Sequence, residues 1–200
     1  MRGPVQRRSK DSTVRMLDAA LALASEGGLD AVTISAVADR SGTSNGSLYH
    51  RFDSRSSLLT ALIDKFLSDI EDEYAGVLAN ATAEPDDVRA LEIVIDAHMR
   101  IFARERALFR AFMIDGRDDP GMKLRGYAAS RTLSGAIISW LQDRFHCTLR
   151  CADTAFRVLY GLGASRVLTE DADLTAQPPS HSELIGSIRN VLIGYLRNCR

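Results

Sequence analysis

The chain has 200 residues, of which 46% are hydrophobic and 26% charged, and its formal net charge is −1. A chain of this size and composition can bury a substantial core without disulfides or metal ions. No run of about 18 apolar residues is present, and the segment after the N-terminus is amphipathic, so we expect a cytoplasmic globular protein with neither a membrane span nor a signal peptide.

Positive charge is concentrated at the start of the chain. Residues 1–60 carry eight Lys or Arg against six Asp or Glu, whereas the remainder carries 17 against 20. Four of the eight, Arg2, Arg7, Arg8 and Lys10, stand in the first ten residues, which contain no Asp or Glu. With Gly3 and Pro4 they predict a mobile basic arm over residues 1–10, and a solvated terminus without a partner is the alternative.

Apolar residues recur at spacings of three and four along the chain, and sustained alternation of apolar and polar residues is absent, so the fold is predicted to be all-α. The first helix is expected from Asp11 or Ser12 to about Ser25. Thr33 is expected to cap a second helix to about Arg40, and Ser44 a third to about Phe52.

Longer helices are expected in the rest of the chain. Ser54 is placed to cap a fourth helix that runs from Arg55 to about Asn80. Turn-forming sequences then separate four further predicted helices, at about 86–114, 121–145, 151–170 and 181–198. The clearest loop is expected over 175–180.

The spacing of Ala38, Gly42 and Leu48 is typical of two short helices that cross at close range. A small residue at position 38 leaves room for the second helix, a glycine at position 42 accepts the left-handed turn, and Leu48 is expected to enter the core. Ile34 and Val37 complete the predicted buried side. The outward face of the second helix is then polar, with Ser44, Asn45, Ser47, Tyr49 and His50.

Small polar groups and planar rings on one helix suit a major groove about 12 Å wide, whose walls carry phosphates. Leu48 and Phe52 are predicted to face the core instead. Each side chain alone also has a structural interpretation, because Tyr49 could be a packing aromatic and His50 a solvated surface residue. The combined pattern favours DNA binding.

These residues resemble the TetR family of bacterial transcriptional regulators. The resemblance covers about residues 12–60 and lies in the stretches TISAVADRSGTS (33–44), GSLYHRF (46–52) and SRSSLL (54–59). It implies a helix-turn-helix domain over residues 11–54, followed by a helical ligand-binding and dimerisation domain over 55–200. In this family the last two helices of each subunit form the dimer interface, which implies a homodimer.

The resemblance also implies residue roles. Asn45 and Tyr49 would face the major groove, with Ser35 near bases and Ser44 in the same contact region. Backbone amides of Thr33 and Ile34 would meet phosphate at a helix N-terminus. Two positions depart from the family pattern, because Arg55 replaces a usual lysine and Arg51 replaces a residue that is often aromatic or histidine. The side chains implied to contact phosphate are Ser47, His50 and Arg55.

The second domain holds aromatic, sulfur-containing and polar residues that could line a largely apolar effector pocket. Plain core packing is the alternative for most of them, since such side chains at helical spacing are usually core. The candidate ligand-binding residues are His98, Met99, Phe102, Phe112, Tyr127, Arg131, Trp140 and Tyr160. An apolar excess on 156–167 and 184–196, with Gly161, Gly163, Ala164 and Gly186 permitting close approach, predicts the dimer interface.

The sequence thus favours a ligand-responsive DNA-binding repressor. No phosphate-binding glycine loop, His-Glu-x-x-His or Gly-x-Ser-x-Gly motif indicates an enzyme, and no cofactor is predicted. A helical small-molecule-binding or protein-interaction module without DNA binding is the alternative. The three cysteines, Cys147, Cys151 and Cys199, are predicted to be free thiols, although His146 with the Cys-x-x-x-Cys pair gives a weak hint of a metal site.

Overall fold

The computed structural model describes residues 4–169 and 171–199, with side chains for 11–169 and 173–199. The described residues form helices and connecting turns without a strand, which confirms the all-α prediction. They divide into two compact units, one of residues up to 68 with 107–127, the other of 69–106 with residues from 128 onward. These units divide the fourth helix after Ser68, whereas the predicted domain boundary at residues 54 and 55 stays a prediction.

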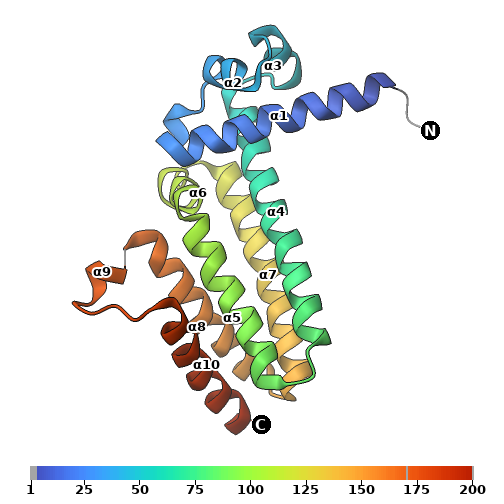
Figure 1. Cartoon of the computed structure of the whole chain (residues 1–200). Helices are drawn as coiled ribbons and strands as arrows, with labels where there is room; N and C mark the ends of the chain where they lie inside the picture. The colour runs from blue at the N-terminus through green and yellow to red at the C-terminus, as the bar shows by residue number, and fades with distance from the viewer. Residues whose placement is uncertain (1–3, 170, 200) are drawn as a thin grey trace. The chain divides into compact units, whose positions relative to one another are not determined.

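The first unit begins with three helices and a short 3-10 turn (Figure 1). They are α1 (Pro4–Gly27), η1 (Leu29–Ala31), α2 (Ile34–Ser41) and α3 (Asn45–Arg51). Helix α1 starts at Pro4 rather than at the predicted Asp11 or Ser12. Residues 1–3 and the side chains of 4–10 lie outside the described part of the chain, so the basic arm stays a prediction.

Helix α4 (Arg55–Ala83) begins behind the predicted cap. The Ser57 amide donates to the Ser54 hydroxyl at 3.2 Å, and the Ser54 amide donates to the Ser57 hydroxyl at 3.1 Å. Two orphan amides are satisfied by this exchange. The first unit also contains α6 (Arg106–Arg110) from Ala107 onward, a π-helical turn η2 (Ala111–Asp115) and the start of α7 (Pro120–Phe145). Phe66 packs between Phe109 and Phe112, with ring centroids 5.2 and 5.3 Å away.

The predicted continuous helix over about 86–114 is wrong. Helix α5 (Asp87–Arg104) ends where the Glu105 amide donates to the Ile101 carbonyl at 2.9 Å, and α6 starts at Arg106. Neither glycine nor proline stands at this break, so the local sequence carried no signal for it.

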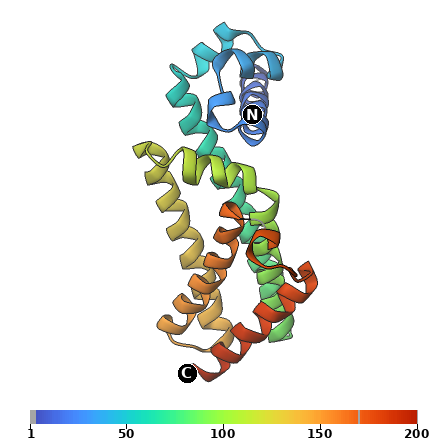
Figure 2. The same cartoon turned by 90° about the vertical axis from the view of Figure 1, so that its left-hand side faces the viewer.

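In the second unit α5 packs against α8 (Leu149–Leu168) and α10 (His181–Asn198), as Figures 1 and 2 show. A short α9 (Asp171–Leu174), which was not predicted, precedes the expected loop. Helix α10 has the predicted bounds, and Ser180 and Glu183 form a reciprocal capping box at its start. No helix in the described part of the chain is long and apolar enough to cross a membrane.

The cysteine prediction is corrected for one pair. Cys151 and Cys199 form a disulfide with their Cα atoms 6.1 Å apart, while Cys147 is a buried free thiol. Cys151 and Cys199 lie 48 residues apart in the sequence, so their approach depends on the packing of α8 and α10 and not on local spacing. Pairing of Cys151 also removes it as a metal ligand, against the weak hint from Cys147 and Cys151.

Candidate nucleic-acid interface

The turn between α2 and α3 has the geometry that the glycine spacing predicts. Gly42 is left-handed, with φ of 66° and ψ of 34°, and the following Thr43 amide donates to the Ala38 carbonyl at 3.0 Å. No atom lies within 4 Å of a Cβ built at position 42, so the backbone conformation and not space requires glycine there. The turn therefore fixes the crossing of α2 and α3 through backbone conformation.

Helix α3 has one buried and one exposed side. Leu48 is 0% exposed, whereas Tyr49, the residue after it, is 58% exposed. Phe52, just beyond the helix, is also buried. We define the recognition face as Ser44, Asn45, Ser47, Tyr49 and His50, all of which are exposed. The predicted division of these side chains between core and solvent is confirmed.

Two hydroxyl groups in this region serve the fold. Thr33 accepts a hydrogen bond from the Ala36 amide at 3.1 Å, and Ser44 accepts one from the Ser47 amide at 3.1 Å. The Thr33 amide donates to the Ala31 carbonyl at 3.0 Å, so it is already engaged. Of the two amides predicted to meet phosphate, Ile34 is the one in the first turn of α2, where helix amides have no partner within the helix. Ser35 follows it and is exposed.

Arg55 has a structural role that the sequence did not indicate. Its Nε donates to the Val32 carbonyl at 2.8 Å and its Nη2 donates to the Leu29 carbonyl. The guanidinium, on the first residue of α4, thus binds carbonyls at both ends of η1. This engagement occupies two of its nitrogens, and the predicted phosphate contact stays a prediction.

A second arginine is held away from the recognition face. Both terminal nitrogens of Arg40 lie 2.6 Å from the Glu26 carboxylate oxygens, a two-point contact that ties α2 to α1. The hydrogen bonds from Arg40 hold the pKa of the Glu26 carboxyl below its usual value. Arg51, by contrast, is exposed at the end of α3 beside the recognition face.

The second unit contains a buried polar site. His98 on α5 is 2% exposed, and its Nδ1 lies 2.5 Å from the hydroxyl of Tyr74 on α4. Its Nε2 has no hydrogen-bond partner among the described residues. Burial lowers the pKa of His98 to about 4, and the nearby Leu159 carbonyl opposes this lowering without completing a hydrogen bond to Nε2. Burial also raises the pKa of Tyr74, so both groups are neutral at pH 7.

Gly163 on α8 closes this site. A Cβ at position 163 would lie 2.5 Å from Nε2 of His98 and 2.7 Å from Cδ2 of Phe102. The aromatic contacts continue to Tyr160, whose ring centroid is 6.1 Å from that of Phe102. Sequence reasoning had identified His98, Phe102 and Tyr160 but missed Tyr74, which is 24 residues from His98 in the sequence.

The other candidate ligand-binding residues lie elsewhere. Phe112 packs on Phe66 in the first unit, and Tyr127 is 55% exposed. Arg131 is exposed on α7, and Trp140 packs against Phe145 at 6.2 Å. Met99 is buried on α5. The candidates Phe112, Tyr127, Arg131 and Trp140 therefore do not belong to the His98 cluster.

Helices α8 and α10 together form a shallow, almost wholly apolar groove. Val158, at 42%, and Val191, at 66%, are the most exposed apolar side chains in it. The predicted interface residues Leu159, Gly163 and Val167 are instead buried within the subunit, because that side of α8 packs against α5. The groove is lined by Val158, Leu162, Ser187, Ile188, Val191 and Leu192.

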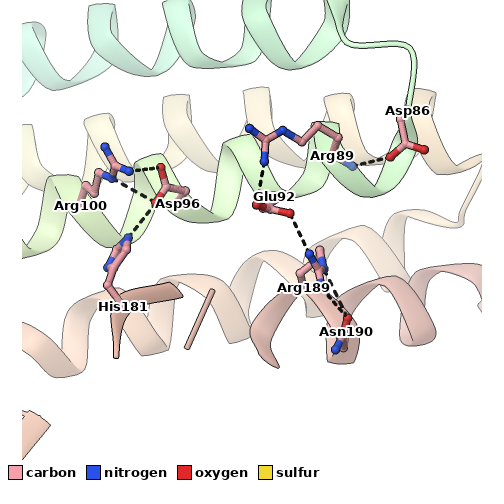
Figure 3. Close-up of polar contacts among 8 residues, drawn as sticks. All are labelled: Asp86, Arg89, Glu92, Asp96, Arg100, His181, Arg189 and Asn190. Atoms are coloured by element: carbon pink, nitrogen blue, oxygen red, sulfur yellow. Dashed lines mark hydrogen bonds and ion pairs between the residues drawn. The ribbon is translucent and has the colours of Figure 1, made fainter. Parts of the chain in front are cut away.

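Polar contacts attach α10 to α5 on the other side (Figure 3). Arg189 Nη1 lies 2.8 Å from Glu92 Oε2, and His181 Nε2 lies 2.7 Å from Asp96 Oδ1. The same Asp96 carboxylate pairs with Arg100 one turn further along α5, at 3.0 Å. These contacts lie at the start and in the middle of α10.

The comparisons with known proteins agree with this arrangement. Residues 16–62 match the family model of bacterial regulatory proteins, tetR family. The chain is 37% identical over 76 residues to the HTH-type transcriptional repressor KstR2 of Rhodococcus jostii, covering 38% of this chain and 37% of the relative. It is 31% identical over 110 residues to KstR of the same organism, covering 52% and 49%. The chain thus spans half or less of the length of these relatives.

Solved structures extend the likeness to the whole fold. A TetR-family regulator structure from Mesorhizobium loti aligns with a TM-score of 0.80 at 16% identity, covering 94% of this chain and 96% of that one. FadR from Bacillus subtilis in complex with stearoyl-CoA aligns with a TM-score of 0.68 at 16% identity, covering 92% and 98%. At this identity the likeness concerns the fold alone.

Proposed function

Because this chain belongs to the TetR family of bacterial regulatory proteins, we propose that it is a sequence-specific DNA-binding repressor that acts as a homodimer in the cytoplasm and responds to a small molecule. The observation that carries this proposal is the two-sided α3, which buries Leu48 completely and exposes the neighbouring Tyr49. Burial of Leu48 thereby fixes the direction in which the recognition face points.

In the proposed complex α3 enters the major groove. Asn45 and Tyr49 are one helical turn apart, so both side chains can reach base edges from the same face. The first-turn amide of Ile34 and the side chains of Ser47 and His50 would contact phosphates, which fix the register of the protein on the duplex. Arg51, exposed beside this face, is proposed as a further phosphate contact.

Two copies are proposed to associate through the α8–α10 groove. Val158 and Val191 expose apolar surface on adjacent helices, and Gly161 and Gly194 have open space where a side chain would stand. A second copy of the same face would bury both valines, and small residues would let the helices of the two subunits approach closely. Two recognition helices related by two-fold symmetry read half-sites one helical turn or a multiple apart.

The effector is proposed to bind at the His98 cluster. A hydrogen-bonding group on an otherwise apolar ligand would satisfy Nε2 of His98, while Phe102 and Tyr160 would contact its apolar part. Tyr74 lies on α4, the helix whose first residues follow the recognition helix in the chain, so a ligand that displaces the Tyr74–His98 hydrogen bond acts directly on α4. The ligand alters DNA affinity only if its own affinity differs between the DNA-binding position of α4 and a second position of this helix.

The DNA proposal is tested by mobility shift with DNA flanking the protein's own gene. Tyr49→Ala and Asn45→Ala are each expected to lower the affinity about tenfold or more. Tyr127→Ala is the matched control, since its ring is almost equally exposed, lies outside helices α2 and α3 and is absent from the proposed effector site. Arg51→Ala should reduce the dependence of log affinity on log salt by about 1. Unchanged affinity in both α3 variants would reject the proposal in favour of a helical module without DNA binding.

The effector proposal is tested with stearoyl-CoA as the first probe, since that ligand combines a long apolar chain with a thioester carbonyl and is bound by the FadR of similar fold. It is expected to raise the melting temperature of the wild type and to have a smaller effect on His98→Phe, which keeps a ring and removes the hydrogen bond. An equal shift in both proteins would place binding away from His98. Long-chain ketones, which carry a carbonyl but no nucleotide, show which of the two groups the protein recognises.

A further inference from the structure

The disulfide joins the two helices that line the apolar groove. Cys151 lies in the first turn of α8 and is buried, whereas Cys199 follows the last residue of α10 and is half-buried. Their Cα separation of 6.1 Å falls within the usual range for a disulfide. Figure 2 shows the end of α10 running towards the start of α8. The bond thus fixes the C-terminal end of α10.

The other polar attachments of α10 lie nearer its start. His181 contacts Asp96 and Arg189 contacts Glu92, both on α5, and these side chains are between a quarter and two-fifths exposed. Exposed ion pairs of this kind hold a helix only weakly. The buried residues Ile185, Ile188, Leu192 and Leu196 add apolar packing along the helix. At the C-terminal end the disulfide supplies a covalent attachment to α8.

We propose that Cys151 and Cys199 are a peroxide-oxidised thiol pair, in which formation of the disulfide fixes α10 on α8 and thereby tightens the dimer. This inference rests on the proposed function, both for the dimer and for the cytoplasmic setting. A DNA-binding protein works in a thiol-reducing cytoplasm, where disulfides are usually transient and redox-sensing rather than permanent. Both helices that the bond joins contribute to the groove, so its state bears directly on the surface proposed for association.

The two cysteines differ in the way that such a pair requires. Cys199, the more accessible, is assigned the first reaction, in which its thiolate attacks one peroxide oxygen, the O–O bond breaks, and a sulfenic acid and one water form. The Cys151 thiolate then attacks that sulfur, the S–O bond breaks, and a second water leaves as the S–S bond forms. Two thiols lose two electrons in total, and one peroxide is reduced to two waters.

The surroundings of Cys151 suit a resolving thiolate. The Thr148 hydroxyl lies 3.0 Å from its sulfur and can donate to it. The sulfur also stands in the first turn of α8, where the helix dipole favours negative charge. Cys147 lies before the start of α8, and burial raises the pKa of its thiol. Its sulfur faces the Leu141 carbonyl at 3.7 Å rather than another cysteine.

The first experiment identifies the bond in the full-length chain. Fully reduced protein is treated with one equivalent of hydrogen peroxide, alkylated and digested without reduction. Wild type and Cys147→Ser are expected to yield one peptide pair that links Cys151 to Cys199, and the single variants Cys151→Ser and Cys199→Ser are expected to lack it. A link that forms mainly between subunits, or that involves Cys147 in wild type, would overturn the assignment.

The second experiment measures the consequence. On oxidation of wild type, amide exchange in the last turns of α10 should slow by about tenfold or more, and the dimer dissociation constant should fall. Cys151→Ser should show neither change, and its behaviour should match that of reduced wild type. An unchanged exchange rate in cross-linked protein would overturn the proposed fixing of α10. DNA affinity measured in dithiothreitol tests the proposed function separately, because it requires no disulfide.

Discussion

Arg55 should contribute measurably to the stability of the first unit, because it is bound by two backbone carbonyls that are distant in sequence. Its Nε and Nη2 reach Val32 and Leu29 from the first residue of α4. Hydrogen bonds to a charged group contribute about 1.5–3 kcal/mol each, and the side chain is 43% exposed, which reduces this. The ion pair with Asp30 is 3.9 Å long, and because the Asp30 side chain is fully exposed, it contributes little to the free energy of unfolding.

Replacement of Arg55 by alanine is therefore expected to lower the free energy of unfolding of the first unit by about 2–4 kcal/mol, and replacement by lysine by about 1–2 kcal/mol. A lysine keeps the positive charge but has one nitrogen in place of the two-nitrogen edge of the guanidinium. Charge for a phosphate contact is thus retained in Arg55→Lys while bracing of η1 is weakened. The two proposed roles of this side chain are thereby separated.

Urea unfolding with two probes provides the assay. The chain has one tryptophan, Trp140, which is buried in the second unit, so its fluorescence reports that unit. Hydrogen exchange of peptides from residues 29–62 reports the first unit. The Arg55 variants should speed that exchange and leave the Trp140 transition in place. Arg51→Ala is the control, with an expected change within about 0.5 kcal/mol. Wild-type exchange in Arg55→Ala would refute the bracing role.

Three further predictions concern the backbone turn and the buried histidine. Gly42→Ala should cost about 1–2 kcal/mol in the same exchange assay, because its left-handed conformation and not crowding is the obstacle, and Gly42→Asn should cost less. Burial lowers the pKa of His98 to about 4, below an unfolded value of about 6.5, so only the unfolded chain takes up the proton as the pH falls between these values. The free energy of unfolding of the second unit should therefore fall by up to about 3 kcal/mol over this range. Unfolding followed by Trp140 fluorescence at pH 7 and pH 5 measures this fall, and an equal pH dependence in His98→Gln would contradict it. Gly163→Ala should destabilise the second unit by about 1–3 kcal/mol, whereas Gly135→Ala on α7 of the same unit, where a built Cβ has no neighbouring atom within 4 Å, should not.

Features of the fold that depend on local chemistry could be predicted from the sequence. The start of α10 follows from its capping box, and the turn at Gly42 follows from the need for a left-handed residue. The helix break at Glu105 could not be predicted, since neither glycine nor proline marks it. The disulfide also escaped prediction, because a separation of 48 residues says nothing about distance in space.

The candidate sites divide in the same way. The recognition face could be predicted because Leu48 is the aliphatic residue of α3, and the polar residues of this short helix were expected to face solvent. Arg55 contacts Leu29, which is 26 positions away in the sequence, and Tyr74 contacts His98, which is 24 positions away. Such contacts arise from packing between helices, and no periodicity within one helix announces them. The sequence therefore predicted the exposed face of α3 better than it predicted the surroundings of His98.

The unpaired nitrogen of His98 offers a physical basis for control by a ligand. Leaving a buried polar atom without a hydrogen bond costs about 1–3 kcal/mol, which is the size of a typical coupling energy between two binding sites. Gly163 leaves no room for a ligand beside Nε2 unless α8 or α5 moves. A ligand that satisfies this nitrogen therefore gains its hydrogen bond only in a rearranged second unit, and that difference in affinity between two states is what a ligand-controlled repressor requires.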